Sequence, residues 1–135
     1  MKGFSTRPFL AIGVAAICLA LAGCGTVSTR SALYAGVPRF PPSDPAKIEL
    51  LPHEPARPHE RLGEVFVDTV DDPARERIDS AVKEEAARLG ADAVFFVMQR
   101  SWVTNYVYWD PAWGPSNNPV PSRAIIGVAI KYTGG

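Results

Sequence analysis

The sequence predicts an α+β fold: a small β-β-α-β-β domain in which one helix packs on a four-stranded mixed sheet. Three observations predict it. Residues 73–89 repeat apolar side chains at helical spacing, residues 93–98 are a continuous apolar run, and residues 124–132 alternate. The chain of 135 residues leaves room for one small domain once its N-terminal segment is set aside.

Two strands are expected before the helix. The first, residues 48–51 (IELL), is stopped by Pro52. The second, residues 61–70 (RLGEVFVDTV), is rich in β-branched side chains. The loop between them contains three prolines.

The helix is expected from about Pro73 to Leu89. Asp72 is the predicted N-cap, Pro73 suits the first helical position, and Gly90 supplies the left-handed residue that ends the helix. The apolar residues form one stripe that must face a sheet: Ile78, Ala81, Val82, Ala86 and Leu89.

Two further strands are expected after the helix. Residues 93–98 (AVFFVM) predict a strand buried on both faces, which we extend toward Tyr108. After an irregular loop, residues 124–132 (AIIGVAIKY) form the last strand, with one face made by Ile126, Val128, Ile130 and Tyr132. Because a strand–helix–strand crossover prefers the right-handed parallel arrangement, the strands at 61–70 and 93–98 should be parallel.

Residues 1–23 have the layout of an export signal peptide. Lys2 and Arg7 precede an apolar run over residues 9–21, which is shorter than the roughly 20 residues that a helix needs to span a bilayer. The run ends in Leu21-Ala22-Gly23-Cys24, which resembles the lipobox of bacterial lipoproteins.

This resemblance implies signal cleavage between Gly23 and Cys24 and attachment of a diacylglyceryl group and further acyl chains, palmitate among them, to Cys24. Two or three such chains hold a protein stably in a membrane. Gly25 resembles the default signal for sorting to the cell outer membrane, on the face toward the periplasm.

Residues 24–46 are expected to be a proline-rich tether and residues 47–135 the folded domain. The tether lacks helical period and strand alternation, and as a flexible coil it would hold the domain roughly 25 Å from the membrane. The alternative is an N-terminal flap that docks onto the domain through Leu33, Tyr34, Val37 and Phe40.

Charge and cysteine content exclude several classes of function. Loss of residues 1–23 removes two of the 14 basic residues and none of the 14 acidic ones, so the formal charge becomes −2. Nucleic acid is therefore not expected as a partner. With Cys24 lipidated, the mature chain has no free cysteine for a disulfide, a thiolate metal site or a nucleophile. No cofactor is expected.

Three segments of the domain resemble small bacterial lipoprotein domains that are similar in layout to the Rcs-type outer-membrane stress-sensor lipoprotein. They are residues 48–51, 62–65 (LGEV) and 85–94 (EAARLGADAV). The same layout is similar to small β-α-β modules described as heavy-metal-binding. The Rcs-type sensor has disulfides that this mature chain lacks, so the resemblance implies the layout and no signalling role.

Both histidines lie in the loop at residues 53–60 (HEPARPHE), each followed by a glutamate. Imidazole and carboxylate suit zinc or nickel, so His53 and His59 are candidate metal ligands. Pro55 and Pro58 exclude the helical spacing of metalloproteases, which favours two solvated loop histidines. A calcium cluster is a further alternative for Asp68, Asp71 and Asp72, but capping and solvation explain these residues.

Aromatic side chains are concentrated between Trp102 and Trp113. Amphipathic rings of this kind bind proteins, sugars or a membrane interface. The candidate interaction surface consists of Tyr108, Trp109, Asp110 and Trp113. The alternative is that the rings cover the open face of the sheet, which we favour for Trp102 and Tyr106.

The expected function is that of a membrane-anchored, periplasm-facing lipoprotein: a non-catalytic interaction or envelope-maintenance module with an envelope protein or a glycan as partner. Enzymatic activity is not expected, because no nucleophile, base and orienting residue can be assembled from the sequence. The alternatives are a metal or small-ligand module using His53 and His59, and a minor hydrolase.

Overall fold

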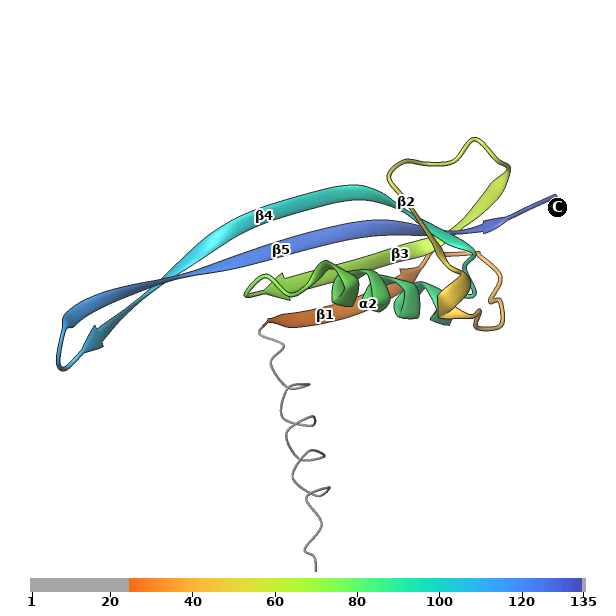
Figure 1. Ribbon diagram of the computed structural model, residues 1–135. Helices are drawn as coiled ribbons and strands as arrows, with labels where there is room; N and C mark the ends of the chain where they lie inside the picture. The colour runs from red at the N-terminus through yellow and green to blue at the C-terminus, as the bar shows by residue number, and fades with distance from the viewer. Residues whose placement is uncertain (1–24, 135) are drawn as a thin grey trace, which may run out of the picture.

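The computed structural model describes residues 25–134 as one α-helix on a five-stranded mixed sheet (Figure 1). The elements in chain order are β1 (Thr26–Leu33), a 3-10 turn η2 (Pro45–Lys47), β2 (Glu49–Leu51), β3 (His59–Val70), α2 (Arg75–Arg88), β4 (Ala93–Asp110) and β5 (Gly114–Tyr132). The strand order is β1-β3-β5-β4-β2. The predicted class, one helix on a mixed sheet, is confirmed. The predicted number of four strands is wrong, because β1 joins the sheet.

Strand β1 lies in the segment predicted to be a tether. It pairs antiparallel with β3 along its whole length. Its side chains toward the helix include the hydroxyls of Thr29 and Ser31, which donate to the carboxylate of Glu85 over 3.3 and 2.7 Å. This inward side is therefore polar at its centre, and the apolar alternation that marks a half-buried strand is missing.

The rest of the expected tether also packs on the domain. The N–H of Tyr34 donates to the carbonyl of Leu62 over 2.9 Å, and the N–H of Ser43 donates to the carbonyl of Ala87 over 2.9 Å. Val37 and Phe40 pack against the core cluster beside the helix. The prediction of a tether is therefore wrong for residues 26–46. They form a strand and a flap docked on the domain, as the alternative interpretation expected.

Strands β4 and β5 form an antiparallel hairpin, and β5 also pairs antiparallel with β3. Strands β3 and β4 therefore run parallel, as predicted, but β5 lies between them. Strand β2 adds to the other side of β4 in parallel over Glu49–Leu51. Pairing across a short turn costs less chain entropy than pairing across the helical crossover, which explains the position of β5.

The N-terminus of the helix differs from the prediction. The helix begins at Arg75, and its N-cap, Ala74, makes no side-chain capping bond. Asp71 and Asp72 have φ angles of 65° and 44°, a conformation in which Asp72 cannot serve as the predicted cap. Its carboxylate instead accepts a hydrogen bond from Arg123 over 3.0 Å.

The C-terminus of the helix agrees with the prediction. Gly90 has a φ of 76°. Its N–H donates to the carbonyl of Ala87 over 3.0 Å, and the N–H of Ala91 donates to the carbonyl of Ala86 over 3.2 Å. This is the Schellman arrangement that a left-handed glycine permits.

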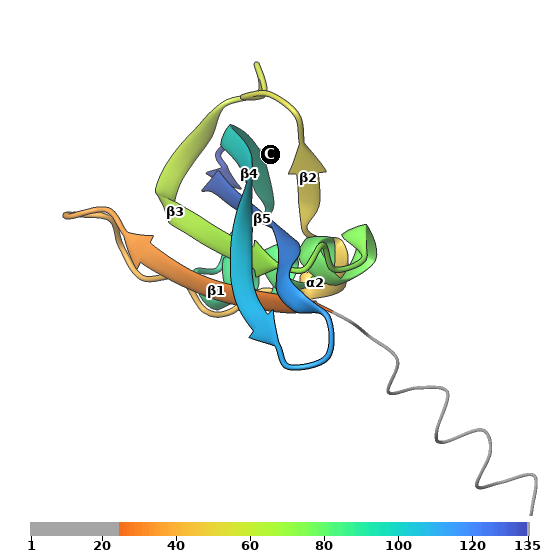
Figure 2. The same cartoon turned by 90° about the vertical axis from the view of Figure 1, so that its left-hand side faces the viewer.

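Both faces of the sheet carry a core. Helix α2 lies on one face of the sheet (Figure 2). The main cluster lies between the two, and Ile78, Val82 and Ala86 are buried in it as predicted. A second cluster on the other face contains Ala93, Phe95, Val128 and Ile130, with Tyr34, Leu51 and Tyr132 packed against it. The expected burial of residues 93–98 ends at Phe95, because β2 ends opposite that residue and leaves Val97 and Met98 exposed. No helix among residues 25–134 has the length and apolar character to cross a membrane.

Candidate functional site

The segment expected as an irregular loop is a projecting β-hairpin. Strands β4 and β5 stay paired to the turn at Asp110 and Gly114. Strand β3 accompanies β5 only as far as Ser122, and β2 accompanies β4 only as far as Phe95. Residues 103–121 therefore form a two-stranded ribbon outside the body of the sheet, which we call the arm (Figure 1).

The arm presents large apolar and aromatic side chains to solvent. Trp109 is 74% exposed and Trp113 is 88% exposed. Six residues of the arm are each more than half exposed: Val103, Tyr106, Val107, Tyr108, Trp109 and Trp113. The alternative that Tyr106 covers the body of the sheet is wrong, because the ribbon carries it beyond β3. Exposed apolar surface on this scale is typical of binding sites.

Asp110 is the one charged residue between positions 103 and 121. Its Oδ1 accepts hydrogen bonds from the N–H groups of Ala112 and Trp113 over 2.8 and 3.1 Å. Gly114 follows with a φ of 83°, which only glycine adopts readily. One oxygen of this carboxylate, which we expected to contact a ligand, therefore closes the turn at the tip of the arm.

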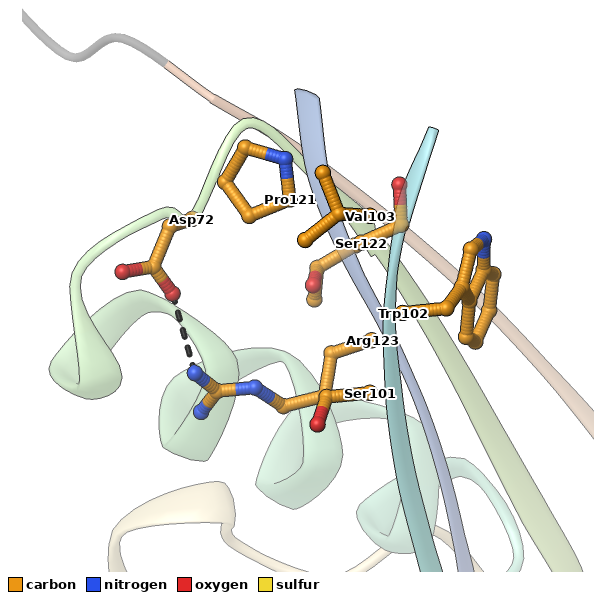
Figure 3. A pocket seen from close by; sticks show the side chains of 8 residues that line it. Asp72, Ser101, Trp102, Val103, Pro121, Ser122 and Arg123 are labelled. Atoms are coloured by element: carbon orange, nitrogen blue, oxygen red, sulfur yellow. Dashed lines mark hydrogen bonds and ion pairs between the residues drawn. The ribbon is translucent and has the colours of Figure 1, made fainter. Parts of the chain in front are cut away.

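A hollow of about 290 Å³ lies at the root of the arm (Figure 3). It is lined by Thr69, Asp72, Ser101, Trp102, Val103, Pro121, Ser122 and Arg123. The carboxylate in this lining, Asp72, pairs with the guanidinium of Arg123 over 3.0 Å. The N–H of Asp71 donates to the carbonyl of Pro121 over 2.8 Å. These two contacts attach the root of the arm to the turn before α2.

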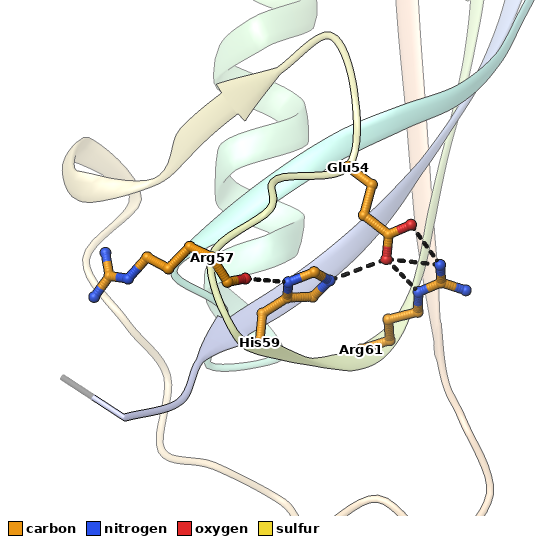
Figure 4. A network of polar contacts seen from close by, with 4 residues as sticks. All are labelled: Glu54, Arg57, His59 and Arg61. Carbon is orange, nitrogen blue, oxygen red and sulfur yellow. Dashed lines mark hydrogen bonds and ion pairs between the residues drawn. The ribbon is translucent and has the colours of Figure 1, made fainter.

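The histidine loop is a local network of polar contacts (Figure 4). Nδ1 of His59 lies 2.7 Å from the carbonyl of Arg57, and Nε2 lies 3.0 Å from Oε1 of Glu54. Arg61 donates to both oxygens of Glu54 over 2.7 Å. Hydrogen bonds from Arg61 and then from His59 lower the pKa of Glu54 below its ordinary value of 4.5.

This network gives His59 a structural role. Its ring packs edge-on against Phe95 with centroids 6.4 Å apart, over the second core. His59 is therefore held in place and is not the solvated side chain of the preferred interpretation, whereas His53 is exposed in the same loop. Among residues 25–134, no three or more His, Cys, Asp or Glu side chains gather to hold a metal ion, and this includes the aspartates at 68, 71 and 72.

Two predicted features lie outside residues 25–134: the signal peptide, and the lipobox with its cleavage site at Gly23 and Cys24. The sequence interpretation missed two others. Glu85 was not recognised as a buried acid, because its hydroxyl partners lie on β1, far away in sequence. The arm was missed because β5 contains prolines at positions 115, 119 and 121, although all three stand at odd-numbered positions, a spacing that an edge strand tolerates.

No family model matches this chain, and no curated protein matches it. A solved structure with some similarity is the crystal structure of the Francisella virulence factor FvfA in its orthorhombic form. It is 15% identical to this chain, with a TM-score of 0.42, and the match covers 77% of this chain and 97% of that one.

Proposed function

We propose that this chain is a lipid-anchored protein of the bacterial cell envelope: a non-catalytic interaction module that binds an envelope protein or a glycan through its arm. Acyl chains on Cys24 would hold it in the outer membrane, on the side facing the periplasm. The observation that carries the proposal is the arm itself, a nearly uncharged ribbon with exposed aromatic side chains on a domain whose other apolar residues are mostly buried or half-buried.

The position of β1 supports a binding surface close to the membrane. Cys24 precedes the start of β1 at Thr26 by two residues, so no spacer of roughly 25 Å separates anchor and domain. Thr26 lies opposite Val70, and Val70 lies opposite Ser122 at the root of the arm. An anchor at Cys24 and the arm would therefore belong to the same end of the sheet.

Site-specific photocrosslinking in cells tests the binding function. A photoreactive phenylalanine at Trp113 should give a discrete adduct with an envelope protein or a peptidoglycan fragment, and Trp109→Ala should abolish that adduct. The same probe at Arg39, an exposed residue of the flap, is the matched control. Absence of an adduct from position 113, or an identical pattern from position 39, contradicts the proposal. An adduct with lipid alone also contradicts it.

Metabolic labelling with palmitate tests the anchor. The label should join the wild-type chain and be lost in Cys24→Ala, which should also leave the membrane fraction. An unlabelled wild-type chain in the soluble periplasmic fraction contradicts the anchor and leaves the crosslinking result to be judged separately.

A further inference from the structure

The two edges of the arm differ in their capacity to pair with another strand. Because the carbonyl of Pro121 accepts from Asp71, the backbone groups of Pro121 lie on the outer edge of β5, away from β4. Backbone direction alternates along a strand, so Pro115, Asn117 and Pro119 face the same edge. Proline has no N–H. Of the four residues that face this edge between positions 115 and 121, Asn117 is therefore the only one with a main-chain N–H to donate.

The β4 edge of the arm has no such block. Val103 lies opposite Pro121 and Trp109 opposite Pro115, so the odd-numbered residues direct their N–H and C=O groups away from β5. These residues include neither a proline nor a charged side chain: Gln99, Ser101, Val103, Asn105, Val107 and Trp109.

Proteins usually block a long free edge with proline, lysine or a bulge, because such an edge pairs with any strand that it meets. In this arm β5 is blocked and β4 is open from Gln99 to Trp109. A two-stranded ribbon is also only marginally stable by itself, and a third strand on its open edge would stabilise it. The open edge therefore has the properties of an interface.

We propose that this edge pairs with the β4 edge of a second copy of the chain, antiparallel across a two-fold axis at Asn105. The charges of the strand determine this register. Between positions 98 and 110, only two side chains of the strand are charged at neutral pH, those of Arg100 and Asp110. With Asn105 on the axis, each Arg100 lies opposite Asp110 of the other copy. The dimer then contains two Arg100–Asp110 pairs, and neither charge is left without a partner.

Neighbouring registers leave the charges unpaired. The open backbone groups belong to odd-numbered residues, so the register can shift only in steps that keep odd opposite odd. An axis at Thr104 places Arg100 opposite Tyr108, and an axis at Tyr106 places it opposite Ala112. In the proposed register Trp102 also lies opposite Tyr108 and Val103 opposite Val107, both favourable cross-strand pairs.

The proposed pairing closes on itself. It produces a four-stranded ribbon in the order β5-β4-β4-β5, whose two outer edges are the proline-blocked edges, so further copies cannot add to the arms. The even-numbered aromatic side chains of both arms, at Trp102, Tyr106 and Tyr108, then share one face. This pairing rests on the proposed function of the arm as an interaction element. Because it uses only the backbone edge of β4, it leaves both faces of the ribbon available to the envelope partner.

Disulfide trapping of the full-length chain in its membrane fraction tests the pairing. Antiparallel hydrogen-bonded neighbours have Cα atoms about 5.5 Å apart, within reach of a disulfide. Asn105→Cys, at the axis, should form a disulfide-linked dimer under mild oxidation. The wild-type chain should remain monomeric on the same non-reducing gel.

Two matched cysteine variants test edge and register. Asn117→Cys places the thiol on the blocked edge of the same arm and should remain monomeric. Val103→Cys places it on the open edge but roughly 13 Å from its symmetry mate, so it should also remain monomeric. Arg100→Glu sets like charges opposite each other and should reduce the dimer formed by Asn105→Cys.

Absence of a dimer from Asn105→Cys overturns the pairing, and so does equal dimer formation by all three cysteine variants. The photocrosslinking above separates this result from the proposed function. An adduct of twice the chain mass indicates a second copy, whereas an adduct with a different envelope component indicates the partner. The pairing of two copies can therefore be refuted while binding of an envelope partner holds, and the reverse is also true.

Discussion

At the residue scale, Glu85 connects the helix to strand β1. Its side chain is nearly buried, accepts from Thr29 and Ser31, and pairs with Arg88 over 2.8 Å. A buried carboxylate needs such partners, because burial without them is costly. The same residue therefore stabilises β1 in the sheet and makes the inward side of β1 polar.

Replacement of Glu85 by alanine should destabilise the fold by about 2 kcal/mol, because it removes charge-assisted hydrogen bonds and leaves two hydroxyls without their acceptor. Urea unfolding measures the change. Glu84→Ala is the matched control: the neighbouring residue is exposed on the same helix, and its loss should change the free energy of unfolding by less than about 0.5 kcal/mol. Equal effects of the two substitutions would show that the Glu85 contacts do not stabilise β1.

Glu54 makes the stability of the histidine loop depend on pH. Its pKa is lower in the folded chain than its ordinary value, so its contribution is present above about pH 4.5 and is lost as the pH falls through the lowered pKa. Glu54→Gln should therefore lower the Tm slightly at pH 7, and this difference should disappear in strongly acidic buffer. A difference in Tm that is constant with pH would contradict the role of the charge. The effect is small because the pair with Arg61 is exposed.

At the element scale, the sequence predicts the parts whose burial is apolar and periodic. The helix from Arg75 to Arg88 and strands β2 and β3 were found within a few residues, because their apolar side chains pack into the cores of the sheet. Strand β1 could not be found in this way, because Thr29 and Ser31 face a carboxylate that the chain supplies 54 to 56 residues later. Only the folded chain brings Glu85 to the inward side of β1.

The candidate site was predicted in composition but not in shape. The aromatic residues at Tyr108, Trp109 and Trp113 were identified, and all three are exposed. The loop expected around them is a continuous strand pair, since prolines at 115, 119 and 121 all fall on one edge of β5. A strand tolerates proline only on the side where it has no neighbouring strand, and the local sequence does not show which side that is.

The end of the helix gives a test at this scale. A Cβ atom at Gly90 would lie 2.6 Å from Cβ of Phe40 and 2.7 Å from the carbonyl oxygen of Pro41, at a φ of 76°. Gly36 has a similar φ of 82° and no atom within 4 Å of the same position. Gly90→Ala should therefore cost about 3 kcal/mol, from backbone strain and displacement of the flap together, and Gly36→Ala only about 1 kcal/mol.

Chemical denaturation of the two glycine variants compares these costs directly. The difference between them isolates the close approach of the flap to the helix end, since both positions share the left-handed backbone. Equal losses would mean that residues 40 and 41 do not pack on Gly90.

At the scale of the whole molecule, the body and the arm are built differently. The body has a core on each face of its sheet, one beneath α2 and one beneath the histidine loop. The arm extends from the same sheet without either cover (Figure 2). The anchor that we propose at Cys24 would join the body at the end from which the arm projects, so one rigid sheet would fix the position of the binding surface relative to the membrane.

The boundary of the folded unit follows from the same architecture. A chain of residues 47–135, the domain expected from sequence, lacks β1 and the flap. It would leave the edge of β3 unpaired, remove Val37 and Phe40 from the core, and deprive Glu85 of both hydroxyl partners. We expect this chain to lose cooperative thermal unfolding measured by near-UV circular dichroism, whereas residues 25–135 should retain it. If the two chains unfold with the same sharp transition, the N-terminal strand is an accessory to the sheet and contributes little to its stability.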